Sequence, residues 1–194
     1  MKIALGQIDP TIGDFAGNLR LIDQAAARAR AAGATLLVLP ELALCGYPPR
    51  DLLERDAFLA ASTAALARLA ARVRGELAVL VGFPEVLPEA AGGHRVANAA
   101  ALIDDGKVAA IRRKSLLPTY DVFDEWRYFE PAHTVAPVPF RGLNLGVSIC
   151  EDIWNDGDFW PRRLYREDPI EKLVAAGADP VSYTHLTLPT TPYV

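Results

Sequence analysis

Three side chains of reactive type each follow a short apolar run that predicts a buried strand: Glu41, Lys114 and Cys150. The runs are residues 36–40, 108–111 and 143–149. In open α/β sheets, reacting groups gather at the carboxyl ends of the strands. A carboxylate, an ammonium and a thiol that meet there would form a cysteine hydrolase site for C–N bonds.

The chemistry of such a site requires an activated thiol. A free thiol with a pKa of about 8.5 is only a few per cent thiolate at neutral pH, so Cys150 needs a base. Glu41 can take the thiol proton and later return it to the leaving ammonia. Lys114 supplies a fixed positive charge that, with the backbone N–H after Cys150, stabilises the oxyanion of the tetrahedral intermediate. The expected intermediate is a thioester, which water then hydrolyses.

Each of these residues, taken singly, also has an ordinary structural interpretation. A cysteine at a strand end is more often a small core residue. Glu41 fits a surface carboxylate or a helix cap, and Lys114 fits a solvated strand end. Spacing alone does not show that the three converge, so the chemical interpretation depends on the elements that position them.

Those elements alternate between strand-like and helix-like segments, which predicts an α/β fold. Helices are expected over residues 18–33, 58–73 and 168–177, with Asn18 as the first N-cap and Asp168 before Pro169 as the last. The almost wholly apolar run 77–83 predicts a strand covered on both faces. Residues 116–139 predict a long ordered loop, a class that is often functional.

A turn signal indicates that the sheet is mixed. Asp105-Gly106 lies between the apolar runs 96–103 and 107–111, which is a strong β-hairpin signal. This argues against a simple dinucleotide-binding unit, as does the absence of Gly-x-Gly-x-x-Gly opening a helix.

The composition narrows the function classes. The 194 residues suit one domain, 51% are hydrophobic, and the net charge of −4 is spread without a basic stripe, so neither nucleic acid nor a membrane surface is expected as partner. Two cysteines give no disulfide framework, and three scattered histidines predict no metal site. The strand-like start is not a signal peptide and no run spans a bilayer, so a cytoplasmic location with reduced thiols is expected.

The last fifteen residues break the alternation. A polar Thr/Pro-rich stretch, 181–191, stands where an apolar strand is expected, and it resembles a translated sequencing-library adapter. We therefore expect the domain to span 1–179 and residues 180–194 to be a non-native tail. A native disordered tail is the alternative, and ordinary genomic sequence beyond codon 179 would contradict the prediction.

Three segments, 39–49, 113–120 and 148–154, resemble the signature blocks of the nitrilase (carbon–nitrogen hydrolase) superfamily, in the family's order. Within it, segments 46–53 and 120–129 are most similar to the glutaminase domains of glutamine-dependent NAD synthetases. The resemblance covers Met1 to about Asp179. It implies an α-β-β-α sandwich with a mixed sheet. It also implies Glu41 as general base, Lys114 as cationic stabiliser, Cys150 as nucleophile and Glu125 as an auxiliary glutamate that orients the site.

The resemblance also implies a glutamine pocket lined by Tyr47, Tyr120, Phe123 and Glu151. The chemistry fits, because the α-ammonium of L-glutamine wants a carboxylate and its aliphatic stem wants aromatic walls. Packing is the expected role of four other aromatic residues, Trp126, Tyr128, Trp154 and Trp160.

The sequence departs from the family pattern at three places. Cys45 stands where Ser or Thr is usual, and Ala132 stands where Gly is usual. After Asp179 the family continues with a core strand and the rest of the sandwich, and then with a synthetase domain that binds ATP and Mg²⁺. We therefore expect a C-terminally incomplete domain that uses no cofactor itself, holds the triad and lacks part of its pocket. The full-length protein is expected to be a homo-oligomer.

Three functions stay open at this point. The leading one is a glutamine amidohydrolase that supplies ammonia for NAD synthesis from nicotinic acid adenine dinucleotide. A stand-alone amidase, nitrilase or carbamoylase would share the triad without needing a partner domain. An inactive fragment or binding module is the third, and we expect little activity from the chain as written.

Overall fold

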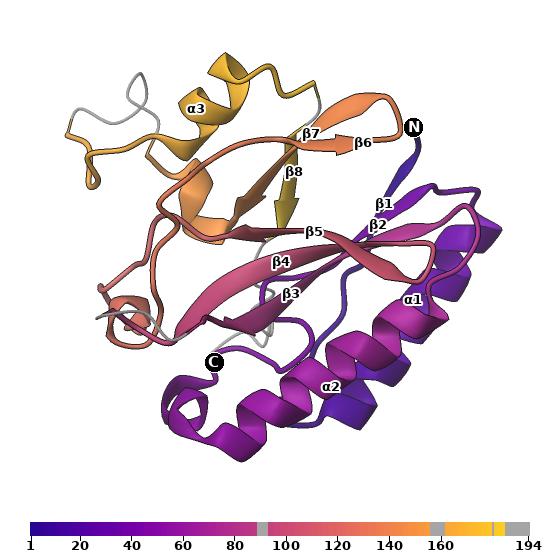
Figure 1. The fold of residues 1–194 in the computed structure, drawn as a ribbon, viewed down its shortest axis with the longest axis horizontal. Helices are drawn as coiled ribbons and strands as arrows, with labels where there is room; N and C mark the ends of the chain where they lie inside the picture. Colours follow the sequence, from indigo (N-terminus) through magenta and orange to yellow (C-terminus); the bar gives the residue numbers. More distant parts are fainter. Residues whose placement is uncertain (89–92, 156–161, 180, 185–194) are drawn as a thin grey trace, which may run out of the picture.

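The computed structural model describes residues 1–88, 93–155, 162–179 and 181–184. Two β-sheets face each other, and helices lie on their outer sides (Figure 1). The first sheet has the strand order β1-β2-β3-β4-β5 and the second has the order β6-β7-β8. The strands are β1 Ile3–Leu5, β2 Leu36–Val38, β3 Ala78–Val86, β4 Val96–Asp104, β5 Lys107–Arg113, β6 Val138–Phe140, β7 Leu143–Ile149 and β8 Val181–Thr184.

The five-stranded sheet is mixed, as predicted. Strands β1, β2 and β3 run parallel, whereas β3 with β4 and β4 with β5 pair antiparallel. The β4–β5 hairpin turns at Asp105 and Gly106, whose φ angles are 41° and 84°. Two successive left-handed residues are what a tight hairpin turn requires, and Asp-Gly adopts them at low cost.

Three α-helices are present in the described residues: α1 Phe15–Ala31, α2 Asp56–Arg72 and α3 Pro169–Ala175. The N-cap of α3 is Asp168, as predicted, since its side chain accepts hydrogen bonds from the N–H groups of Ile170 and Glu171. The predicted cap of α1 is wrong. Asp14 caps α1 by accepting from the Gly17 N–H, and Asn18 lies inside the helix.

The reason for that error is tertiary. Asn18 is buried, and its side chain bonds the backbone N–H and C=O of Thr11 and the C=O of Leu44. It therefore holds the loop before α1 against the turn after β2. An Asx residue four positions upstream was free to cap the helix, and either residue type serves there.

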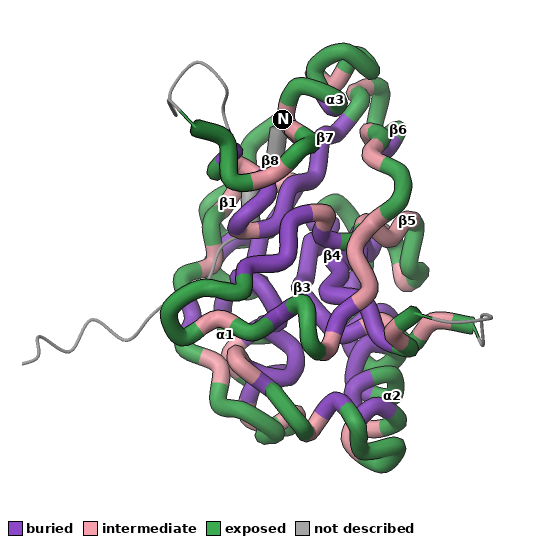
Figure 2. The backbone as a smooth tube through the Cα atoms, turned by 90° about the vertical axis from the view of Figure 1, so that its left-hand side faces the viewer, coloured by how far each residue is buried: buried purple, intermediate pink, exposed green. Residues whose placement is uncertain are grey.

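Strand β3 is covered on both faces, as its apolar sequence predicts. Val79, Val81 and Phe83 pack in a cluster with α1 and α2, whereas Ala78 and Leu80 pack against the second sheet. The buried backbone accordingly runs through the middle of the molecule, along the central strands (Figure 2). With α3 beside β7, the layers are helix, sheet, sheet and helix (Figure 1). The predicted α-β-β-α sandwich with a mixed sheet is confirmed.

The last described residues bear on the predicted domain boundary. Val181–Thr184 forms β8 and pairs parallel to β7, although the sequence placed these residues in a polar tail. Strand pairing does not test whether the codons are native, so the boundary at 179 stays a prediction. Residue 180 and residues 185–194 lie outside the described part. Across the described residues, every helix is too short or too polar to traverse a lipid bilayer.

Candidate active site

The ends of three strands bring the predicted catalytic residues to one place between the sheets. Lys114 follows β5, and its ammonium lies 2.7 Å from Oε1 of Glu41 and 2.8 Å from Oε2 of Glu125. The three side chains are exposed by 0%, 1% and 4% respectively. The surface interpretations of Glu41 and Lys114 are therefore wrong. A charge with no solvent contact persists only when it is paired and hydrogen-bonded, which the two carboxylates provide.

Electrostatics couple these three residues. Burial alone would lower the pKa of Lys114, but the charges of Glu41, Glu125 and Cys150 outweigh burial and raise it, so the ammonium stays protonated. Burial raises the pKa of Glu125 to about 7, although Lys114 opposes the shift. Tyr47 donates a hydrogen bond of 2.9 Å to Oε1 of Glu125. Glu125 is thus poised between its charged and neutral forms near neutral pH.

Cys150 lies at a sharp turn where β7 enters a short 3₁₀ helix, Cys150–Ile153. Its φ of 46° is left-handed, which a residue with a side chain adopts only when its surroundings hold it there. Cys150 is half-buried, and its charge contributes to the raised pKa values of Lys114, Tyr47 and Tyr120. The second thiol, Cys45, is sealed in the core, where burial raises its pKa. Of the two cysteines, only Cys150 is therefore partly accessible and close to the ion cluster.

Asp152 ties the turn at Cys150 to the segment after Lys114. Its buried carboxylate accepts from the N–H groups of Ser115 and Leu116, both at 2.9 Å, through Oδ1. Through Oδ2 it accepts from the N–H of Ile149 at 3.1 Å. One side chain thus fixes the backbone on both sides of the site.

A glycine makes room for the turn that carries Glu41. A Cβ atom on Gly82 of β3 would lie 2.3 Å from the backbone nitrogen of Leu42 and 2.8 Å from the carbonyl oxygen of Pro40. No carbon approaches backbone that closely. The chain after β2 therefore crosses directly over β3 at this residue, and that crossing points Glu41 inward.

The predicted substrate residues form an aromatic and acidic wall. The rings of Tyr47 and Tyr120 lie 6.3 Å and 5.7 Å from that of Phe123. The buried carboxylate of Glu151 accepts hydrogen bonds from the hydroxyls of Tyr120 and Tyr165, the shortest being 2.8 Å. The structure thus gathers all four predicted residues near Cys150 and adds Tyr165, which the sequence analysis missed.

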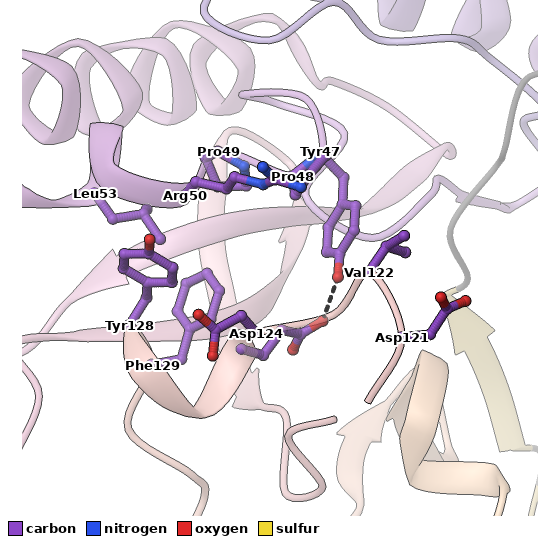
Figure 3. Close-up of a pocket in the computed structure, with 11 residues that line it drawn as sticks. Tyr47, Pro48, Pro49, Arg50, Leu53, Asp121, Val122, Asp124, Tyr128 and Phe129 are labelled. Atoms are coloured by element: carbon purple, nitrogen blue, oxygen red, sulfur yellow. Dashed lines mark hydrogen bonds between the residues drawn. The ribbon is translucent and has the colours of Figure 1, made fainter. Parts of the chain in front are cut away.

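A pocket of about 290 Å³ adjoins this wall (Figure 3). Tyr47 points across it to Glu125, so both residues belong to the pocket and to the site. The remaining lining residues are Pro48, Pro49, Arg50, Leu53, Asp121, Val122, Asp124, Tyr128 and Phe129. The pocket thus has room for a small molecule beside Glu125.

Some predictions near the site need correction. Trp126 and Trp154 are 56% and 50% exposed, so the expectation that they pack is wrong, while Tyr128 packs partly buried against a core cluster. Trp160 lies outside the described residues. Ala132 is accommodated at its atypical position, where its N–H bonds the carbonyl of Lys114 at 2.9 Å. Within the described ranges, no group of three or more His, Cys, Asp or Glu is arranged to hold a metal ion.

Asn98 is the residue at the site that the sequence analysis overlooked and that had a visible signal. It is the one polar side chain in the apolar run 96–103, and a buried polar residue needs a partner. In the structure it is fully buried and donates to Glu41 and Glu125. Asp152 and Gly82 gave no such signal, because their importance depends on which segments cross.

The sequence and fold of this chain are similar to those of known proteins. The family model for carbon-nitrogen hydrolases matches residues 2–161. A glutamine-dependent NAD(+) synthetase from Synechocystis sp. is 42% identical over 193 residues, covering 98% of this chain and 34% of that protein. The chain thus spans about a third of the length of that relative.

The chain also resembles solved structures, among them a synthetase and an amidase. A glutamine-dependent NAD+ synthetase from Acinetobacter baumannii, in complex with ADP, has a TM-score of 0.80 and 31% identity, covering 95% of this chain and 32% of that one. A mutant amidase from Nesterenkonia sp. AN1 has a TM-score of 0.76 and 29% identity, covering 95% and 64%. That mutant carries the acetamide moiety of fluoroacetamide covalently at its active-site cysteine.

Proposed function

The chain belongs to the carbon–nitrogen hydrolase family, and we propose that it is the glutamine-hydrolysing domain of a glutamine-dependent NAD synthetase. The observation that carries the proposal is the solvent-free ion cluster of Glu41, Lys114 and Glu125 beside the half-buried Cys150. The similarity to NAD synthetases over nearly the whole chain supports glutamine as the amide donor.

In the proposed reaction, Glu41 accepts the thiol proton as the sulfur of Cys150 attacks the carboxamide carbon of glutamine. Lys114 and the backbone N–H of Glu151 stabilise the oxyanion. The intermediate collapses, the C–N bond breaks, and the proton held by Glu41 leaves with ammonia. Water then attacks the thioester with Glu41 as base, which releases glutamate and restores the thiol.

In the proposed pocket, separate side chains bind the α-ammonium and the methylene stem of glutamine. The carboxylate of Glu151 binds the α-ammonium. Among the described residues it accepts side-chain hydrogen bonds from the hydroxyls of Tyr120 and Tyr165 alone, so it can accept more. The rings of Tyr47 and Phe123 cover the methylene stem. Ammonia would then serve a synthetase domain outside this chain, which would use ATP and Mg²⁺ to amidate nicotinic acid adenine dinucleotide. We expect the full-length protein to be a cytoplasmic homo-oligomer.

A simple amidase is the second candidate, because the Nesterenkonia enzyme shares the fold without being named a synthetase. Covalent trapping separates the two. The chain is treated with a diazoketone analogue of glutamine or with fluoroacetamide, and adducts are located by peptide mass spectrometry. We expect one glutamine-analogue adduct on Cys150, unchanged in Cys45→Ser and absent in Cys150→Ala.

The other outcomes decide between the candidates. An adduct with fluoroacetamide alone supports the amidase, and no adduct on a folded chain contradicts both. For the whole protein, glutamine-driven NAD formation should disappear in Cys150→Ala while ammonia-driven formation remains. Equal glutamine-driven activity in that variant refutes the role of Cys150.

A further inference from the structure

Asn98 contacts every member of the buried ion cluster. Its Nδ2 donates to Oε1 of Glu41 at 2.6 Å and lies 3.4 Å from Oε2 of Glu125. Its backbone carbonyl accepts the N–H of Lys114 at 2.8 Å. Because both side-chain neighbours are carboxylates, the amide must present its NH₂ group to them. A fully buried amide is costly. Among the described residues, the hydrogen-bond partners of its NH₂ group both belong to the cluster, and its Oδ1 has none.

The two oxygens of Glu41 are consequently unlike. Oε1 accepts from Nζ of Lys114 at 2.7 Å and from Asn98, which uses its two lone-pair directions. Oε2 is buried and has no hydrogen-bond partner among the described residues. An unsatisfied carboxylate oxygen without solvent is unfavourable in a resting protein. It is the one position on Glu41 with capacity to receive a proton.

We propose that Asn98 is a positioning residue that assigns the two oxygens of Glu41 different tasks. Together with Lys114 it holds Oε1, and it thereby reserves Oε2 for transfer of the Cys150 proton. The inference rests on the proposed hydrolysis, since it concerns the base of that reaction. It does not require that glutamine be the substrate.

Loss of the Asn98 amide has a defined consequence. The terminal torsion of a glutamate is broad, so without the second donor the carboxylate can turn and offer both oxygens to Lys114. The ionised form also loses one charge-assisted hydrogen bond, so the cluster takes up a proton at higher pH. Asn98→Asp keeps the side-chain volume and replaces the donor with a third carboxylate, which strengthens the effect.

The test measures alkylation of Cys150 by iodoacetamide as a function of pH, with intact mass as readout. Cys45 is sealed, so peptide mapping should find a single adduct. We expect the acid limb of the rate profile to move up by about one pH unit in Asn98→Ala and further in Asn98→Asp. Ser62→Ala is the control, because it removes another fully buried polar group, on α2, and its limb should equal that of the wild type.

Two further readouts keep this inference separate from the proposed function. If Asn98→Ala does not fold, Asn98→Asp alone decides, because it leaves no cavity. A folded Asn98→Asp whose profile overlays the wild type overturns the inference, even if glutamine hydrolysis is intact. A shifted limb in a chain that traps no amide supports the inference and contradicts the proposed function. With an active full-length protein, kcat for glutamine should fall at least tenfold in Asn98→Asp while KM stays unchanged.

Discussion

Lys114 carries its charge where no water reaches it, and the two glutamates around it share the task of neutralising it. If both were ionised, the cluster would hold a net negative charge in an apolar interior. The raised pKa of Glu125, about 7, relieves this by admitting a proton near neutrality.

This arrangement predicts a pH dependence of stability. The folded-state pKa of Glu125 lies above its ordinary value of 4.5, so its proton is held more tightly in the folded chain. Its contribution to the free energy of unfolding is present below pH 4.5 and is lost as pH rises through about 7. Between pH 5 and pH 7, the free energy of unfolding measured by urea denaturation should therefore decrease less in Glu125→Gln than in the wild type.

Glu171→Gln serves as control for that experiment, since Glu171 is an exposed residue on α3. The free energy of unfolding of this variant should decrease between the two pH values by as much as that of the wild type. Equal decreases in all three proteins would contradict the assignment of the raised pKa to Glu125.

The residue types at the candidate site were visible in the sequence, because a carboxylate, an ammonium and a thiol each follow an apolar run. The resemblance to the family, and not the spacing, favoured their convergence over their ordinary structural roles. Asn98 was detectable as a polar residue in an apolar strand, but nothing in the sequence said which groups it would meet. The exposure of Trp126 and Trp154 was not predictable, because burial of an aromatic depends on which segment folds over it.

At the scale of elements, the site depends on two turns and on the contact between them. Cys150 is left-handed, and Asp152, two residues later, accepts three backbone N–H groups from both sides of the site. Burial raises the pKa of Asp152 to about 6, although those donors favour its charged form. The turn at Cys150 and the segment after Lys114 are thus held as one unit.

Removing this buried carboxylate should cost more free energy of unfolding than removing the half-buried cap of α3. Asp152→Ala leaves buried N–H groups unpaired, and we expect a loss of about 3 kcal/mol in the free energy of unfolding. Asp168→Ala removes the cap of α3, and we expect about 1 kcal/mol. Urea denaturation of both variants gives the comparison, and a loss in Asp152→Ala no larger than in Asp168→Ala would refute the buried tie.

Elements were predicted well where the signal is local. The Asp105-Gly106 hairpin and the Asp168-Pro169 helix start are specified by neighbouring residues, and both are confirmed. The cap of α1 was missed because Asn18 is used in a contact with Leu44, which lies 26 positions away. Local patterns cannot distinguish a capping amide from one that joins two loops.

For the whole molecule, β3 is the shared centre of two layers. Successive residues of the strand face opposite sides, with Val79 toward the helices and Leu80 toward the second sheet. The sandwich therefore has two apolar interfaces that meet in one strand, and the site lies where the second interface reaches the strand ends.

Two neighbouring substitutions should separate these interfaces. Leu80→Ala should lower the free energy of unfolding by about 3 kcal/mol and speed hydrogen exchange in β7. Val79→Ala should instead speed hydrogen exchange in α1 and α2. Both residues are essentially unexposed, so they are matched for burial. Hydrogen exchange followed by mass spectrometry measures the exchange rate of each segment. The same pattern of rates in both variants would contradict the layered packing.

Gly82 shows that the candidate site depends on the absence of a side chain at this position. It contributes no atom to the reaction, yet any substituent there would occupy the path of the backbone that delivers Glu41. A lineage that replaced this glycine could keep every acid, base and nucleophile and still abandon the reaction. A search for the acid, base and nucleophile residues alone would still count that descendant as an enzyme, although its backbone no longer places Glu41 in the site.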